Sequence, residues 1–177
     1  EELGSQTTFR DQFLNEIRVA MRLVDKNIVQ IRDVGLTADG LLYYTMDFCP
    51  GITLAQLLRQ EGKLAITRAL LVILNVLRAL QTAHAAGIIH RDLKPANIMV
   101  QGEGGKESVK VLDFGIAMAI EAKGDKPKGF AGSPHYMPPE QFLGEEIGFY
   151  TDLYSVGVIL YECIAGQKPY PGGTAQE

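Results

Sequence analysis

The segment His90-Arg91-Asp92-Leu93-Lys94-Pro95-Ala96-Asn97 directly follows a long apolar stretch of this 177-residue sequence. A second short segment, Asp113-Phe114-Gly115, follows a strand-like run. Together the two segments hold two carboxylates, a carboxamide, a lysine and an arginine. Phosphoryl transfer needs such a set, because a carboxylate orients a hydroxyl, oxygen atoms bind Mg²⁺ and cations offset the transferring charge. Pro95 keeps the first segment from continuing as a helix and fixes the approach to Asn97.

The residues around these two segments show helical and strand-like patterns. Apolar residues at helical spacing predict a long helix up to about Ala86, with Gly87 as a left-handed stop. The residues that define its apolar face are Ile66, Leu70, Ile73, Leu77 and Leu80. Strands are expected at residues 98–101 and 108–112. Residues 153–165 are apolar nearly all round and predict a buried helix, with Thr151 or Asp152 as its N-cap. Residues 116–139 show no period, and a structureless segment of that length is usually functional.

The N-terminal part predicts a helix and then a β-hairpin. An amphipathic helix is expected at residues 10–24, with Phe13, Ile17, Ala20 or Met21, and Val24 on one face. The strand-like runs at residues 28–34 and 41–48 are joined by Ala38-Asp39-Gly40, which is a hairpin turn signal. Pro50-Gly51 interrupts the chain before a short helix at residues 54–60. This order predicts an α+β protein with a small sheet-bearing part (residues 1–48) and a mostly helical part (residues 49–177).

Composition argues against several classes of protein. With 46% hydrophobic residues and 17 Lys+Arg against 21 Asp+Glu, for a net charge of −4, the sequence is typical of a globular domain. Basic runs are absent, so no nucleic-acid partner is expected. No uninterrupted apolar stretch reaches ~18 residues, so no membrane contact is expected. Cys49 and Cys163 belong to no metal or redox motif, which favours a reducing compartment such as the cytoplasm.

Four segments, in this order, resemble those of the eukaryotic-type serine/threonine protein kinases common in bacteria. Besides the two segments above, residues 132–137 (GSPHYM) lead into Pro138-Pro139-Glu140, and residues 152–157 read DLYSVG. The resemblance extends over essentially the whole chain. It implies a bilobal kinase fold, ATP and Mg²⁺ as cofactors, and Ser or Thr hydroxyls of proteins as phosphate acceptors.

The resemblance also implies a role for each matching position. Asp92 is similar to the catalytic base, Lys94 to the lysine that steadies the γ-phosphate, and Asn97 and Asp113 to the two Mg²⁺ ligands. The ATP site would further contain Glu16 as partner of a phosphate-binding lysine, Met46 as gatekeeper, the backbone of Asp47 and Cys49 at the adenine edge, and Met99 beneath the ring. Structural roles would fall to Arg91 and Gly115, to Asp152 beneath the catalytic loop, and to a regulatory spine of Ala20, Ile31, His90 and Phe114. In the activation segment, Ser133 would bond toward Asp92 and Lys94, and Glu140 would pair with an arginine.

Each of these side chains also has an ordinary structural interpretation. Taken singly, Asp92 could be a turn residue, Glu16 a solvated helix charge and Asp152 a helix cap. Met46 and Met99 could fill a core. His90 is better explained as a structural histidine than as a general base, even within a kinase.

The sequence also departs from the kinase pattern. It contains no Gly-rich loop before residue 16 and no Val-Ala-x-Lys strand, so the lysine expected to pair with Glu16 is absent from these residues. The arginine expected to pair with Glu140 is absent too. We therefore expect a fragment of a kinase domain that is inactive alone, derived from an active parent. The alternatives are a pseudokinase or scaffold, which Asp92, Asn97 and Asp113 argue against, and a small-molecule kinase, which residues 132–140 disfavour.

Residues 116–132 contain no Ser, Thr or Tyr. The parent is therefore expected to need no phosphate in this loop. The charge facing Arg91 would come from Glu121 or Asp125, or Arg91 would pack against water or backbone carbonyls.

Overall fold

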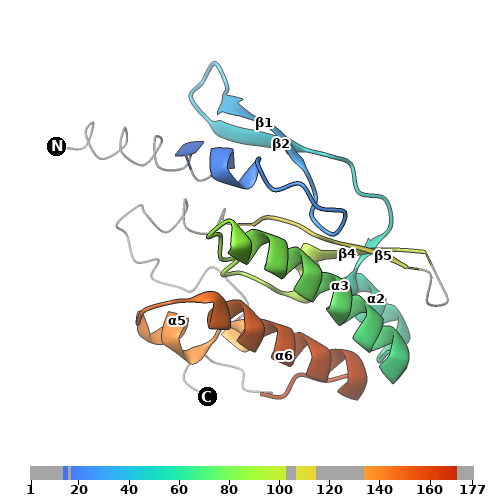
Figure 1. Cartoon of the computed structure of the whole chain (residues 1–177). Coiled ribbons are helices and arrows are strands. Elements are labelled where there is room, and N and C mark those ends of the chain that lie inside the picture. Colours follow the sequence, from blue (N-terminus) through green and yellow to red (C-terminus); the bar gives the residue numbers. More distant parts are fainter. Residues whose placement is uncertain (1–13, 16, 103–106, 115–133, 171–177) are drawn as a thin grey trace.

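The computed structural model describes residues 14–15, 17–102, 107–114 and 134–170. Within these ranges the strands form two antiparallel sheets, one in the order β1-β2 and one in the order β3-β4-β5. In Figure 1 the β1-β2 hairpin lies at one end, α5 and α6 lie at the other, and α3 and the second sheet lie between them. The elements are β1 (Ile31–Leu36), β2 (Leu42–Met46), β3 (Ile52–Thr53), α2 (Leu54–Glu61), α3 (Ile66–Ala85), η1 (Pro95–Asn97), β4 (Ile98–Gln101), β5 (Ser108–Val111), η2 (Pro134–Tyr136), α5 (Pro139–Leu143) and α6 (Phe149–Ala165). The predicted α+β architecture is confirmed.

The hairpin forms around the predicted turn, but β1 covers Ile31–Leu36 instead of residues 28–34, and β2 is shorter than the predicted run at residues 41–48. The turn is closed by the Thr37 N–H, which donates to the Leu41 carbonyl over 2.9 Å, and Gly40 takes the left-handed conformation that the turn needs (φ 82°). Residues 14–15 and 17–20 are helical, and buried Ile17 and Ala20 pack with Ile31 in a small hydrophobic cluster.

The first helix ends earlier than predicted. Residues 21–22 form a turn, so the helical period no longer applies to Val24, which is 81% exposed. Leu23 is buried in its place, in the main core. The predicted position of Val24 on the buried face is therefore wrong.

The crossing at Pro50-Gly51 is a close approach of two backbones. Gly51 has φ 110°, and a Cβ at this position would overlap the Val100 carbonyl oxygen of β4. Only glycine fits there. After the crossing, α2 begins with a reciprocal cap. The Gln56 N–H donates to Thr53 Oγ1 (3.1 Å), and the Thr53 N–H donates to Gln56 Oε1 (2.8 Å), which confirms the predicted short helix.

Helix α3 has the predicted length, and of the residues predicted on its buried face Ile73 and Leu80 are buried, but the face as a whole is shifted. Its stop is confirmed, because Gly87 is left-handed (φ 76°) and the Ile88 N–H donates back to the Ala83 carbonyl. Ile66 and Leu70, expected on the buried face, are 61% and 50% exposed. The buried residues are Ala69, Val72, Ile73, Val76, Ala79, Leu80 and Ala83. Small alanines face the core because α6 and β5 pack directly on this helix.

The length and apolar character of α3 would also suit a membrane span. Its described surroundings are those of a core helix, since its buried face packs on α6 and β5 within the main hydrophobic cluster.

Helix α6 differs from its prediction at its start and in its burial. It begins at Phe149, and neither Thr151 nor Asp152 is the N-cap, because both lie inside the helix. The Gly148 N–H at the cap position donates to Thr151 Oγ1 (3.2 Å). One side is solvated, with Leu153 52% and Tyr161 46% exposed, so the prediction of a wholly buried helix is wrong.

The second sheet supports the site. β4 has the predicted bounds, and β5 ends one residue earlier than expected, at Val111. Residues 116–133 of the segment expected to be irregular lie outside the described residues. The remainder of that segment contains η2 and the first residue of α5, which the sequence did not predict.

Candidate active site

The loop between α3 and β4 alternates buried apolar residues with accessible polar ones. Leu93 is 1% exposed and Pro95 is buried, whereas Asp92, Lys94 and Asn97 are half-buried. The loop is closed locally by the Asp92 N–H, which donates to the His90 carbonyl (2.9 Å). The apolar residues thus anchor the loop and leave its polar side chains at the surface.

The three polar side chains of the loop contact one another. Lys94 Nζ lies 2.6 Å from Asp92 Oδ2. The Asn97 amide nitrogen donates to the Asp92 carbonyl over 2.9 Å and more weakly to Asp92 Oδ2 over 3.3 Å. Because the Asn97 NH₂ group makes these contacts, the lone pairs of Asn97 Oδ1 stay available to a hydrogen-bond donor or a metal ion. The sequence predicted these residues as a group, and the structure brings them together.

Asp113 lies beside this group, immediately after β5. The Leu112 N–H donates to the Asn97 carbonyl (2.9 Å), which ties the two segments together. Asp113 is left-handed (φ 59°), a conformation that few residues other than Gly, Asn and Asp tolerate. Its Oδ1 accepts a 2.7 Å hydrogen bond from the Tyr44 hydroxyl of β2. Burial, and then this bond, raise the pKa of Tyr44.

Asp152 of α6 fixes the loop from below. Its side chain is fully buried, and it accepts hydrogen bonds from the backbone N–H groups of His90 and Arg91, each over 2.9 Å. Arg91 has φ 67°, so the Asp152 carboxylate stabilises a backbone conformation that costs free energy. The resemblance assigned this role to Asp152, and the contacts agree with it.

Sequence reasoning missed His84, a third partner of Asp152. His84 Nε2 lies 2.7 Å from Asp152 Oδ2, and its ring stacks on Phe149 with centroids 4.7 Å apart. The signal in the sequence is weak, since a histidine in the last turn of a helix usually needs no partner beyond the helix end.

His90 is a structural residue. It is fully buried, and its Nε2–H donates to the Leu112 carbonyl (2.8 Å), while its ring meets Phe114 edge-on at 4.8 Å. Burial lowers the pKa of His90, an effect larger than the opposing pull of the carboxylate of Asp152. The other ring nitrogen, Nδ1, is buried and has no hydrogen-bond partner among the described residues, so a substrate hydroxyl has no access to it and His90 does not serve as the catalytic base.

The loop geometry agrees with what the comparisons with known proteins found. The family model that matches is the protein kinase domain, over residues 2–177. The chain belongs to the protein kinase family. It is 42% identical over 170 residues to serine/threonine-protein kinase pkn3 of Myxococcus xanthus, which covers 93% of this chain and 31% of that protein. Identity to PkaA of Streptomyces coelicolor, also a serine/threonine-protein kinase, is 38% over 178 residues, or 100% of this chain and 33% of PkaA.

A third relative has the same relation to the chain. The serine/threonine-protein kinase PknE of Mycobacterium tuberculosis is 39% identical over 173 residues, which are 97% of this chain and 30% of PknE. The chain spans about a third of the length of these relatives. The kinase resemblance drawn from the sequence is confirmed.

The segment that connects β2 to β3, residues 47–51, is called the hinge below, and it has fewer contacts than the loop. The Asp47 N–H donates to the Gln30 carbonyl (2.9 Å), and its carboxylate pairs with Arg32 in solvent (2.5 Å). Arg32 lowers the pKa of Asp47, whereas burial raises the pKa of the Cys49 thiol.

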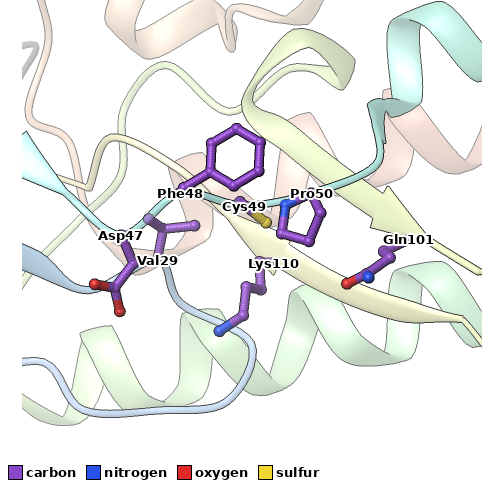
Figure 2. A pocket seen from close by; sticks show the side chains of 7 residues that line it. All are labelled: Val29, Asp47, Phe48, Cys49, Pro50, Gln101 and Lys110. Atoms are coloured by element: carbon purple, nitrogen blue, oxygen red, sulfur yellow. The ribbon is translucent and has the colours of Figure 1, made fainter.

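A hollow of about 250 Å³ adjoins the hinge (Figure 2). It is lined by Val29, Asp47, Phe48, Cys49, Pro50, Gln101 and Lys110. Met46 and Met99, expected around the adenine, are not among its lining residues. Met46 is 40% exposed at the end of β2, and Met99 lies on β4 with Lys110 opposite it on β5.

The described part of the activation segment is docked on α6. Glu140 Oε1 accepts from the Thr151 hydroxyl (3.0 Å). The Tyr136 hydroxyl donates to Glu162 (2.6 Å), and the Ser155 hydroxyl donates to the Tyr136 carbonyl (2.8 Å). Burial and the Glu162 carboxylate raise the pKa of Tyr136. Sequence reasoning missed the Tyr136–Glu162 pair.

Three predicted site residues, Glu16, Gly115 and Ser133, lie outside the described residues, so their assigned roles stay predictions. Of the expected spine, Ala20 and Ile31 share the small cluster, and His90 contacts Phe114.

Proposed function

We propose that the complete protein to which this kinase domain belongs transfers the γ-phosphoryl group of ATP to Ser and Thr hydroxyls of proteins. The observation that carries the proposal is the contact of Asp92 with Lys94 and Asn97, in a loop bonded directly to the segment that holds Asp113. The names of its relatives support the same acceptor class.

Each group has a chemical role in this proposal. Asp92 accepts the proton of the substrate hydroxyl while the oxygen of that hydroxyl bonds to the γ-phosphorus. The bond from that phosphorus to the β–γ bridging oxygen breaks, and ADP leaves with the electron pair. The ammonium of Lys94, 2.6 Å from Asp92, offsets the negative charge on the transferring group.

Kinases in general use Mg²⁺ with ATP, and the residues present fit that ion. Mg²⁺ prefers oxygen donors and takes few ligands from the protein, because phosphate oxygens and water complete its shell. Asn97 Oδ1 is free of the amide contacts described above, and Asp113 supplies a carboxylate. We assign these two residues as the metal ligands. The bound ion supplies charge neutralisation at the phosphates.

We assign the adenine contacts to the hinge. The Asp47 N–H is bonded to the Gln30 carbonyl, which leaves the Asp47 carbonyl and the Cys49 backbone as candidates for the base edge. Met46 and Met99 are assigned to the walls of the adenine site. We further propose a cytoplasmic location, because ATP is available there and the free thiols of Cys49 and Cys163 are kept reduced. Nucleic acid and membrane are not proposed as partners.

The test is phosphate transfer from radiolabelled ATP by the complete protein to a general protein acceptor, followed by phosphoamino-acid analysis. Label on serine or threonine is expected. Asp92→Asn should lower kcat by roughly 10²- to 10⁴-fold while ATP affinity survives, because Asp92 does not hold the nucleotide.

Asp113→Asn provides the contrast. It should weaken Mg²⁺-dependent ATP binding as well as turnover, since it removes a charged ligand. Near-normal turnover in Asp92→Asn would contradict the assignment. Binding of ATP without transfer by the wild type would instead favour a pseudokinase.

A further inference from the structure

Among the residues that the structure describes, the Tyr44 hydroxyl is the side-chain group that donates a hydrogen bond to the Asp113 carboxylate. Its bond to Asp113 Oδ1 measures 2.7 Å and joins residues 69 positions apart in the sequence. Tyr44 lies on β2 in the hairpin, whereas Asp113 follows β5 in the second sheet. The bond therefore links the N-terminal sheet directly to a residue that we assign to the metal.

The ring of Tyr44 is held independently of its hydroxyl. It packs against the small cluster of Ile17, Ala20 and Ile31 and is half-buried. β2 is paired along its length with β1, in which Val34 is the partner of Tyr44. The hydroxyl thus extends from a packed ring on a paired strand, which restricts its position.

Asp113 needs such a fixed partner. Its backbone is left-handed, and the next residue, Phe114, is buried against His90. These features fix the Asp113 backbone but not the rotation of its carboxylate. A hydrogen bond to Oδ1 fixes that rotation, and in the described part of the chain Oδ2 accepts no hydrogen bond.

We propose that Tyr44 is a positioning residue that holds the Asp113 carboxylate in the orientation that binds Mg²⁺ with nucleotide. The inference rests on the proposed function, because it takes Asp113 as a metal ligand. A phenol is protonated at neutral pH, so the Tyr44 hydroxyl acts there as the donor of the 2.7 Å bond to Asp113. Movement of the hairpin would change the orientation of this ligand.

The test is a Mg²⁺ titration of the complete protein with a fixed concentration of a fluorescent ADP analogue. Tyr44→Phe keeps the packed ring and removes the hydroxyl. The Mg²⁺ concentration at half-maximal nucleotide binding should rise roughly tenfold, the scale of a lost hydrogen bond to a charged group. Nucleotide affinity in EDTA should stay unchanged, whereas a purely structural role would weaken nucleotide binding both with and without Mg²⁺. The unliganded protein loses one hydrogen bond to a charged group, so its unfolding temperature should fall slightly while the protein stays folded.

Tyr43→Phe is the matched control. Tyr43 is the neighbour on the same strand, is 39% exposed and pairs with Gly35 on β1. Its variant should titrate like the wild type.

An unchanged or lower Mg²⁺ midpoint in Tyr44→Phe would overturn the inference, and a lower midpoint would mean that the hydroxyl competes with the metal. Loss of folding in Tyr44→Phe would also overturn it, because the ring is retained. A wild type whose nucleotide binding ignores Mg²⁺ would remove the proposed function as well.

Discussion

The loop between α3 and β4, which carries Asp92, and the hinge both connect packed elements. The loop is held by buried hydrogen bonds, whereas the polar contacts of the hinge are exposed to solvent. Beneath the loop, Asp152 is fully buried and binds two backbone N–H groups and His84. At the hinge, Phe48 is 90% exposed, and the Asp47 carboxylate meets Arg32 in solvent.

This difference separates two uses of polar groups. A buried and well-satisfied network specifies one geometry, because any other arrangement would leave charges without partners in a medium of low polarity. The hinge has few buried contacts, so its conformation is set by its neighbours and costs little to change. The loop that carries Asp92 is thus the rigid reference, and the hinge is the adaptable part.

The largest expected effect comes from removing the anchor of the loop. Asp152→Ala leaves two backbone N–H groups and His84 without their acceptor. The left-handed backbone of Arg91 also loses the hydrogen bond that stabilises it. The free energy of unfolding should fall by about 3–5 kcal/mol. Urea denaturation of the complete protein measures the change.

Asp33→Ala is the control for this variant. Asp33 is exposed on β1, and its carboxylate accepts from the adjacent Val34 N–H (2.8 Å). It should change stability little. If Asp152→Ala behaved in the same way, the contrast between loop and hinge would not hold.

The second expected effect sharpens the account of the anchor. His84→Phe retains an aromatic ring to stack on Phe149 but removes the 2.7 Å contact with Asp152. A hydrogen bond to a charged group contributes about 1.5–3 kcal/mol, so the loss should be smaller than that of Asp152→Ala. The double variant should lose little more than Asp152→Ala alone, and a fully additive loss would show that the two residues act separately.

The sequence predicted the polar residues within the loop better than the distant residues that hold the loop and Asp113 in place. Asp92, Lys94 and Asn97 lie within a few residues of one another, so their spacing alone brings them together. His84 and Asp152 are 68 positions apart, and Tyr44 and Asp113 are 69 apart. No local pattern reports such pairs, although the kinase resemblance did identify Asp152 and Asp113.

Helical periodicity correctly placed Ile73 and Leu80 on the buried face of α3, but it misplaced the rest of that face for a different physical reason. In α3 the large side chains of Ile66 and Leu70 made the stronger apolar pattern, but the buried face contains alanines. Close packing of α6 and β5 on this helix selects small residues, and hydrophobicity alone does not report how near a neighbour approaches. The C-terminal end of α3 was predictable because Gly87 is a local stop signal.

A third prediction uses pH to test the buried ring in the loop. Burial is the main cause that lowers the pKa of His90 in the folded protein below its ordinary value of 6.5. At a pH between the folded pKa and 6.5, the unfolded chain therefore binds a proton that the folded chain does not. The stability from a neutral His90 is complete above pH 6.5 and is lost as the pH falls through the folded pKa. The slope for one proton is at most about 1.4 kcal/mol per pH unit.

His90→Phe should remove the part of the pH dependence of the unfolding free energy that comes from the protonation of His90. The variant is expected to be less stable than the wild type at pH 7, because the Leu112 carbonyl loses its donor, but the gap should narrow as the pH is lowered. Urea titrations at several values from pH 7 downward measure it. A gap that stays constant would mean that the pKa of His90 is the same in the folded and the unfolded protein, and a gap that widens would mean that folding raises it.

The smallest expected effect is at the hinge. Arg32 and Asp47 form a bidentate pair at 2.5 and 2.7 Å, but their side chains are 63% and 46% exposed. Water and salt screen such a pair, and ordering two solvated side chains offsets most of the attraction. A double-mutant cycle with Arg32→Ala and Asp47→Ala should therefore give a coupling energy within experimental error at 0.15 M salt. A large coupling would show that the hinge is held by this pair as firmly as the loop is held by Asp152, and the distinction between the two regions would then be wrong.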